Sequence, residues 1–184
     1  MREHTWVFGY GSLIWRPDFE FVERRVATLN GYSRRFWQGS HDHRGIPERP
    51  GRVVTLVPDA SARCIGMAYR ISATVLTEVF ENLDHREKNG YDRRQVTLTL
   101  EDGIAIDSIL YLAPRGNFAY LGEAPLTEVA QQIASSEGPS GRNDAYLFEL
   151  AQALRELHST DDEHVFQLER LVLEITQHQT SNGA

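Results

Sequence analysis

The stretch VTLTLEDGIAIDSILYL at residues 96–112 decides the fold class of this chain. Apolar and polar residues alternate from 96 to 100, and Asp102-Gly103 separates them from a second apolar run at 104–112. Alternation at a period of two predicts a strand with one buried face, and Asp-Gly is a favoured turn of two-residue β-hairpins. The stretch therefore predicts an antiparallel hairpin within a sheet.

Apolar spacing elsewhere predicts the other strands and helices. Short runs rich in Val, Ile, Tyr and Trp are typical of strands, and apolar residues recurring at i, i+3, i+4 and i+7 are typical of amphipathic helices. We expect strands at 6–8, 52–57 and 64–71, and helices at 74–88, 126–133, 147–154 and 160–175, the last beginning with a capping box at Thr160–Glu163. Strands that come first, with one helix among them, and helices that fill the C-terminal third indicate an α+β domain with a curled or closed antiparallel sheet.

The amino-acid composition indicates the broad class of protein to which the chain belongs. The chain has 184 residues, of which 41% are hydrophobic and 24% charged, and its net charge is −7. These values exclude wholesale disorder, and no apolar run approaches the ~20 residues of a membrane span. We expect a single domain over residues 1–184 with a frayed tail at 176–184. The acidic balance argues against nucleic-acid binding, and the lone cysteine, Cys64, indicates a reducing, cytoplasmic location. The oligomeric state stays open.

One carboxylate lies on the apolar side of the helix expected at 74–88. At about 100° per residue, the apolar residues of this helix, and Glu87 with them, fall within about 60° of Leu76. A carboxylate aimed at a core is desolvated, which raises its pKa and makes it a better proton acceptor near neutrality. Glu87 is therefore a candidate general base. The alternatives are a side chain that swings into solvent at the helix end, or a buried ion pair with Arg86 or another arginine.

A glycine-rich loop follows the first expected strand, with the sequence Phe8-Gly9-Tyr10-Gly11-Ser12-Leu13. Two glycines and a serine let successive backbone N–H groups converge on an anion. The loop is not a P-loop, because no Gly-Lys-Ser/Thr follows, and not a dinucleotide loop, because the third glycine is missing. On these residues alone, an anion-binding loop and a plain β-turn both stay open.

Arginine dominates the basic residues of the first third, where nine arginines face six acidic residues over positions 1–57. The guanidinium fork binds carboxylates at two points, so part of this segment is a candidate anion contact; a genome-wide preference for arginine is the alternative. The run His41-Asp42-His43 contains residue types that bind metal ions. Adjacent loop residues rarely complete a metal site, however, and no distant Cys/His cluster adds ligands. We expect no metal ligands.

Several blocks of the chain, in order, resemble the ChaC-type γ-glutamylcyclotransferases. They run from about residue 6 to 175 and cover nearly the whole chain. The blocks are Val7–Trp15, Tyr32–Ser40, Asp42–Gly45, Pro50–Leu56, Arg86–Lys88, Tyr120–Gly122 and Gly138–Asn143. The sequence departs from the family at Asn89, where the family usually has glycine; asparagine also adopts left-handed dihedral angles.

The resemblance implies a γ-glutamylcyclotransferase-like fold, a small mixed or antiparallel β-barrel flanked by helices. It implies a lyase of glutathione catabolism that converts glutathione to 5-oxoproline and cysteinylglycine without a cofactor, with glutathione as its small-molecule partner. The family's catalytic glutamate falls on Glu87, and its substrate-holding loop falls on Tyr10–Leu13. Helical spacing and motif position thus each indicate Glu87 as the candidate general base.

The expected site therefore combines Glu87 with groups that hold the substrate. Glu87 takes a proton from the substrate's α-ammonium, and the freed amine then attacks the γ-carbonyl carbon. The expected substrate-binding residues are Val7, Phe8, Gly9, Tyr10, Gly11, Ser12, Leu13, Arg34, Arg35, Arg44 and Tyr120. The last four are expected as substrate contacts, for example to its carboxylates. One alternative is a cyclotransferase acting on other γ-glutamyl-amino acids or γ-glutamylamines. Another is a non-catalytic small-molecule sensor or interaction module.

Overall fold

The computed structural model describes residues 4–181 of the chain. They form two compact units, the first comprising residues 4–33 and 56–117 and the second comprising residues 34–55 and 118–181. The strands are β1 (His4–Gly9), β2 (Glu23–Ser40), β3 (Gly51–Ser72), β4 (Asp92–Leu100), β5 (Ala105–Leu112), β6 (Glu137–Gly138) and β7 (Gly141–Arg142). The helices are the short 3₁₀ turn η1 (Ser12–Ile14), α1 (Leu76–Arg86), α2 (Leu126–Ser135), α3 (Asn143–Glu156) and α4 (Glu163–Ser181).

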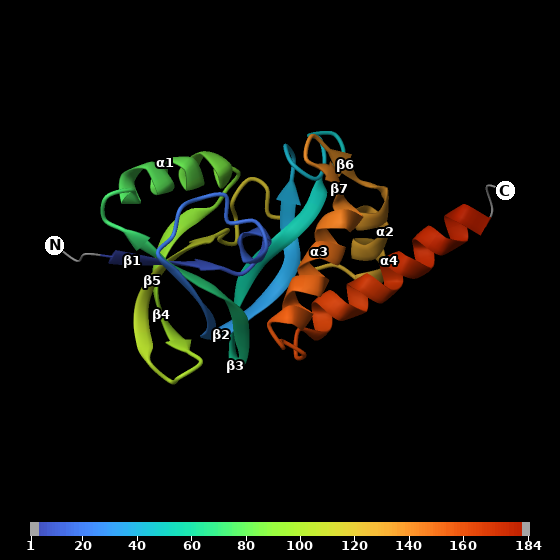
Figure 1. Cartoon of the computed structure of the whole chain (residues 1–184). Helices are drawn as coiled ribbons and strands as arrows, with labels where there is room; N and C mark the ends of the chain where they lie inside the picture. Colours follow the sequence, from blue (N-terminus) through green and yellow to red (C-terminus); the bar gives the residue numbers. More distant parts are fainter. Residues whose placement is uncertain (1–3, 182–184) are drawn as a thin grey trace. The chain divides into compact units, whose positions relative to one another are not determined.

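The large sheet is a closed barrel in the strand order β1-β3-β2-β4-β5 (Figure 1). Strand β1 runs antiparallel to β3, with Val7 opposite Tyr69, and parallel to β5, with Val7 opposite Ile109. The parallel pairing of β1 with β5 closes the barrel and makes it mixed. The predicted α+β class, with a small barrel and a helical C-terminal third, is confirmed.

The hairpin that was predicted from residues 96–112 is present as β4 and β5. Leu100 donates its N–H to the Ile104 carbonyl at 2.9 Å, and Gly103 donates its N–H to the Leu100 carbonyl at 2.9 Å. Gly103 has a φ of 83°, the left-handed conformation that this turn requires and glycine supplies. The hairpin prediction is confirmed.

Strands β2 and β3 are longer than the local sequence predicts. The strands expected at 52–57 and 64–71 are one continuous strand, β3, and β2 was not predicted at all. Asn30-Gly31 in β2 has the composition of a turn, and Gly31 does adopt a φ of 82°, yet the strand continues through it. Pairing with neighbouring strands overrides this local turn preference.

The first unit buries one face of each barrel strand. Its fully buried side chains include Phe8, Ile71, Leu98 and Leu110, which come from β1, β3, β4 and β5. Cys64 is 1% exposed on β3 and packs as a small apolar residue.

The second unit packs its three helices against one another (Figure 1). Leu147, Leu150, Leu168 and Val172 from α3 and α4 are fully buried, as their helical spacing predicts. The boundaries of α4 differ from the prediction. It begins at Glu163, because Asp162 offers its carbonyl to the N–H groups of the first turn and its carboxylate to Arg34 and Ser159.

The helix α4 continues to Ser181, so the expected fraying after Ile175 is wrong for residues 176–181. The Thr176 hydroxyl donates to the Val172 carbonyl at 3.0 Å, which ties its side chain to the preceding turn. The rest of the expected tail, residues 182–184, lies outside the described residues.

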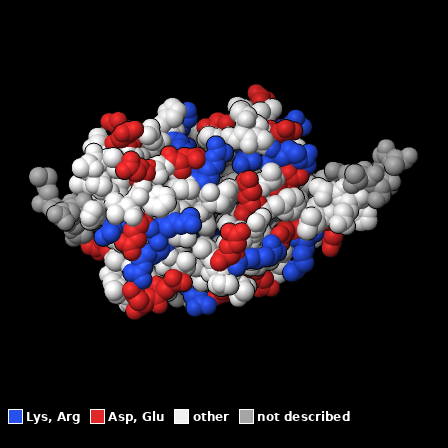
Figure 2. All heavy atoms as spheres, in the orientation of Figure 1, with Lys and Arg blue, Asp and Glu red and all other residues white. Residues whose placement is uncertain are grey.

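Charges of both signs are intermixed on the face drawn in Figure 2. Several arginines pair with carboxylates within their own unit; examples are Arg25 with Asp102 at 2.8 Å and Arg70 with Glu23 at 3.0 Å. Among residues 4–181, no helix is both long and apolar enough to cross a membrane.

A partly buried histidine, His164, links β2 to α4 in the second unit. The His164 ring stacks on Phe36, and its Nε2 accepts the Phe36 N–H at 3.1 Å. Burial lowers the pKa of His164 from 6.5 to about 4, with further lowering by the charges of Arg35 and Arg52. The folded chain therefore keeps this ring neutral, as an acceptor, well below neutral pH.

His164 predicts a specific loss of stability in acid. Between pH 6.5 and about 4 the unfolded chain binds a proton at this ring that the folded chain does not, so the free energy of unfolding falls as the pH falls through this window. The full loss is about 3 kcal/mol. His164→Gln keeps an acceptor but cannot protonate there, so its unfolding free energy, measured by urea titration from pH 7 to pH 4, should fall less steeply than that of the unmodified chain.

The matched control is His178→Gln, which changes an exposed histidine on the same helix and should keep the full pH dependence. An equally steep fall in His164→Gln and in the unmodified chain would contradict the assignment.

Candidate active site

Glu87 follows directly after α1, which ends at Arg86 rather than at residue 88. Its N–H donates to the Leu83 carbonyl at 2.8 Å, which places Glu87 as the cap of the last turn. The apolar face predicted for this helix is confirmed, since Val79, Phe80 and Leu83 are all buried. The Glu87 side chain is 18% exposed, so it is largely removed from water.

The C-terminal half of α1 is fixed to the barrel by a polar cluster. Tyr111 on β5 donates its hydroxyl to the Asp84 carboxylate at 2.6 Å, and Arg93 on β4 donates to the same carboxylate at 2.7 Å. The Arg93 guanidinium also lies over the Phe80 ring, 4.2 Å from its centre. Burial and the Asp84 carboxylate raise the pKa of Tyr111, which therefore stays a hydroxyl donor. These contacts fix the turn that carries Glu87.

The glycine-rich loop turns sharply at the end of β1. A Cβ atom on Gly9 would lie 2.6 Å from the Leu13 Cβ, and one on Gly66 of β3 would lie 2.4 Å from the Gly9 carbonyl oxygen. Contacts this short are forbidden, so both positions require glycine. The loop then continues into η1, where the Ile14 N–H donates to the Gly11 carbonyl at 2.9 Å.

Two buried tyrosine hydroxyls hold this loop. Tyr69 on β3 donates to the Leu13 carbonyl at 2.6 Å and lies 3.2 Å from the Ile14 carbonyl. Tyr10, within the loop, donates to the Tyr111 carbonyl at 2.6 Å. Burial raises the pKa of Tyr69 to about 12, so its hydroxyl keeps the proton that makes this bond.

Arg86 joins the loop to the end of α1. Its Nη2 donates to the Ser12 Oγ at 2.7 Å, and its Nη1 donates to the Arg16 carbonyl at 3.1 Å. Its Nε lies 3.7 Å from the Glu87 carboxylate. The ion pair that the sequence left open as an alternative for Glu87 is therefore present, and it joins Glu87 to the loop.

The structure brings Glu87 and the predicted loop Val7–Leu13 together within the first unit. Within that loop, the side chains of Val7 and Phe8 are 0% and 1% exposed and belong to the barrel core. Tyr10 and Leu13 are buried as well, whereas Gly11 and Ser12 are partly exposed. A substrate contact at Val7 or Phe8 is thereby limited to the backbone.

The predicted residues Arg34, Arg35, Arg44 and Tyr120 all belong to the second unit. Arg34 is fully buried and forms an ion pair with Asp162. Arg35 donates from Nη1 to the Arg34 carbonyl at 2.9 Å. The buried ion pair fits a structural role for Arg34, and the predicted substrate contacts of these residues stay predictions.

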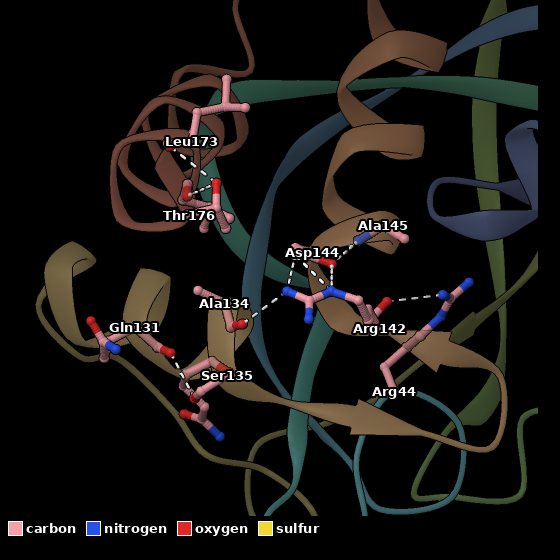
Figure 3. A network of polar contacts seen from close by, with 11 residues as sticks. Arg44, Gln131, Ala134, Ser135, Arg142, Asp144, Ala145, Leu173 and Thr176 are labelled. Carbon is pink, nitrogen blue, oxygen red and sulfur yellow. Dashed lines mark hydrogen bonds and ion pairs between the residues drawn. The ribbon is translucent and has the colours of Figure 1, made fainter. Parts of the chain in front are cut away.

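Arg44 lies in a network that joins its loop to the β6–β7 hairpin (Figure 3). It donates to the Arg142 carbonyl at 3.1 Å, and its guanidinium lies over the Tyr146 ring, 5.7 Å from the centre. Figure 3 also shows Arg142 facing the Asp144 carboxylate and the Ala134 carbonyl. Arg44 thus has structural partners in its own unit.

Arg52 is an internal arginine that the sequence reading did not single out. It is 7% exposed and donates to the Gln132 side chain at 2.6 Å and to the carbonyls of Phe36 and Gly122 at 3.0 and 3.1 Å. Tyr120, which pairs with Gln38 in an isolated β-bridge, lies in the same segment as Gly122. Arg52 therefore holds the Tyr120–Gly122 segment against the end of β2.

Among residues 4–181, no group of three or more His, Cys, Asp and Glu side chains is assembled that could hold a metal ion. In the His41-Asp42-His43 run, His43 Nδ1 lies 3.1 Å from the Ser140 hydroxyl. The absence of a metal requirement stays a prediction.

Several positioning residues of the first unit were missed by the sequence reading: Ser12 as a partner of Arg86, Gly66, Tyr69, Asp84, Arg93 and Tyr111. Periodicity assigned Tyr69 and Tyr111 to strands, but it carries no information on which carbonyl or carboxylate a hydroxyl meets across the barrel. The Arg86–Lys88 block, which contains Glu87, indicated only that Arg86 could pair with Glu87.

The chain is similar to proteins of known family. The profile described as ChaC-like protein matches residues 5–175. A zebrafish (Danio rerio) protein named glutathione-specific gamma-glutamylcyclotransferase 1 is 39% identical over 177 residues, which cover 94% of this chain and 90% of the relative. A Schizosaccharomyces pombe protein named glutathione-specific gamma-glutamylcyclotransferase is 40% identical over 182 residues, covering 89% of this chain and 90% of the relative.

The chain belongs to the ChaC-like family.

Solved structures agree with this membership. A crystal structure of a yeast γ-glutamylcyclotransferase specific to glutathione matches this ChaC-like chain with a TM-score of 0.88 at 31% identity, covering 94% of this chain and 97% of the other. A structure named gamma-glutamyl cyclotransferase matches with a TM-score of 0.57 at 16% identity, covering 91% and 87%, and shows the shared fold alone.

The Tyr69 hydroxyl predicts a measurable effect on the loop of this ChaC-like chain. Tyr69→Phe leaves the Leu13 carbonyl without its buried donor, so the free energy of unfolding should fall by about 1–2 kcal/mol. Amide hydrogen exchange in residues 11–16 should speed up more than exchange in β4 and β5. Urea titration and exchange mass spectrometry measure the two effects.

Ser61→Ala, which removes an exposed hydroxyl bonded to Asp59 on the same strand, is the control and should change neither measurement. Unchanged loop exchange in Tyr69→Phe would contradict the role of this hydroxyl.

Proposed function

We propose that this chain degrades glutathione by cyclotransfer, with Glu87 as the single general base and acid. The observation that carries the proposal is that the Glu87 carboxylate and the glycine-rich loop are joined through Arg86 in one unit. Relatives named glutathione-specific gamma-glutamylcyclotransferase, at 39% and 40% identity over most of the chain, support the choice of substrate. The proposed base and the glycine-rich loop both belong to the first unit.

The first step is removal of a proton from the substrate. At neutral pH the α-amine of the γ-glutamyl group is an ammonium, which has no lone pair for attack. Glu87 accepts one of its protons and later returns a proton to the departing amine of cysteinylglycine. The 18% exposure of Glu87 supports this role, because a largely dry carboxylate transfers protons to a bound group rather than to bulk water.

The second step is closure of a five-membered ring. The bond from the α-nitrogen to the γ-carbonyl carbon forms, and the bond from that carbon to the cysteinyl nitrogen breaks, giving 5-oxoproline and cysteinylglycine with no water consumed. The tethered amine gains the effective molarity of an intramolecular attack, up to ~10⁵ M or more when aligned. Backbone N–H groups of Gly9–Leu13 would hold the γ-glutamyl group and stabilise the oxyanion.

The reaction as proposed uses no cofactor and no metal, and the proposed partner is glutathione itself. A reducing cytoplasmic location fits both a chain with one cysteine and a substrate that sets the thiol balance of that compartment.

Glu87→Gln tests the base. The substitution keeps the shape of the side chain and removes its basicity, so kcat for 5-oxoproline formation should fall at least ~10²-fold while glutathione still binds. A coupled assay of 5-oxoproline gives kcat, and calorimetry gives the affinity for glutathione. Turnover near that of the unmodified chain would exclude Glu87 as the base.

The matched control is Glu78→Gln, an exposed glutamate on the same helix, which should keep full turnover. The same assay tests the other substrate class, since γ-glutamyl-alanine turned over with a higher kcat/KM than glutathione would favour a broader γ-glutamyl-amino-acid activity.

Oxygen labelling separates cyclotransfer from hydrolysis. Because the proposed attack comes from the substrate's amine, glutathione incubated in ¹⁸O-water should give one unlabelled 5-oxoproline for each cysteinylglycine, as measured by mass spectrometry. A hydrolase would give free glutamate carrying ¹⁸O as its first product, and that result would rule out the proposed mechanism.

A further inference from the structure

Arg86 contacts four residues at the end of α1. Its Nη2 meets the Ser12 hydroxyl at 2.7 Å, and its Nη1 meets the Arg16 carbonyl at 3.1 Å and the Asp18 carboxylate at 3.5 Å. Its Nε lies 3.7 Å from the Glu87 carboxylate. The guanidinium therefore lies between the segment that follows the glycine-rich loop and the proposed base.

The contacts depend on the shape of a guanidinium. Its planar fork presents separate donors at fixed angles, so that the Ser12 hydroxyl and the Arg16 carbonyl are held at the same time. A lysine ammonium could keep the positive charge but could not donate to both of these oxygens with the same geometry. The Arg86 side chain is 24% exposed, so its charge is only partly screened by water.

A cation beside Glu87 also favours the charged form of that carboxylate. A general base must be ionised before it can accept the ammonium proton, and Arg86 supplies the nearby charge at 3.7 Å. The Asp18 carboxylate also faces this guanidinium, at 3.5 Å from its Nη1, and Arg16 holds the same carboxylate at 2.9 Å.

We propose that Arg86 is a positioning residue with two separable effects: its fork sets the distance between the Ser12 turn and Glu87, and its charge keeps Glu87 ionised. The inference rests on the proposed role of Glu87 as base. A purely structural role, in which Arg86 only complements the C-terminal dipole of α1, would affect stability alone.

The two effects are separated by Arg86→Gln and Arg86→Lys, compared through kcat, KM and the pH profile of kcat/KM with glutathione. Arg86→Gln loses both charge and fork, so kcat should fall at least ~10-fold and the midpoint of the acid limb should rise by about one pH unit. Arg86→Lys keeps the charge, so its acid limb should stay near that of the unmodified chain while KM rises several-fold. Ser12→Ala removes the hydroxyl that accepts a hydrogen bond from Arg86, and it should raise KM without moving the acid limb of the pH profile.

Arg94→Gln is the matched control, because Arg94 is an exposed arginine of the same unit paired with Asp92 at 3.2 Å, and it should change none of these values. An Arg86→Gln enzyme with an unmoved acid limb and unchanged KM, altered only in thermal stability, would overturn the proposal. Failure of the proposed base is distinguishable, because in that case Glu87→Gln itself stays active.

Discussion

Closure of the barrel through β1 is the constraint on which the first unit depends. This strand pairs with β5 at Trp6 and Val7 and with β3 as far as its last residue, Gly9, which lies opposite Met67. The chain must leave the barrel there within a very small space. The Gly9 carbonyl passes so close to Gly66 that Gly66 can carry no side chain, and Leu13 approaches Gly9 so closely that Gly9 can carry none either. The sharp turn that begins the glycine-rich loop therefore requires glycine both where β1 ends and at the facing position of β3.

Polar side chains then fix the helix that carries Glu87. The apolar face of α1 accounts for its packing through Val79, Phe80 and Leu83, but such contacts tolerate sliding and rotation. Hydrogen bonds from Tyr111 and Arg93 to Asp84 define one arrangement of the last turn. Burial of the apolar face thus provides the stability of α1, and the directional contacts of its polar edge set the position of the proposed base.

Arginines of the second unit act largely as internal hydrogen-bond donors. Arg34 is paired with Asp162, Arg44 with the Arg142 carbonyl, and Arg52 with three uncharged oxygens. A guanidinium has five donors and stays charged when buried, so it can join several carbonyls at once where a lysine could join few. The arginine-rich first third, read from the sequence as a candidate anion surface, is in this unit mainly a set of cross-links between loops and helices.

The sequence by itself determined the α+β class, the hairpin at its Asp-Gly turn, the apolar faces of the helices, and Glu87 as the candidate base. These features depend on residues that are near one another along the chain, where period and turn chemistry decide the outcome. It did not determine the long strand β2, because Asn30-Gly31 has the local character of a turn, and Gly31 does adopt a left-handed φ, yet strand pairing carries β2 on through it. Nor could it match Tyr69 with Leu13 or Arg86 with Ser12, since each pair is separated by more than fifty residues. Only the closed barrel brings those partners within hydrogen-bond distance, and the tertiary structure alone therefore decided how the loop and Glu87 are held together.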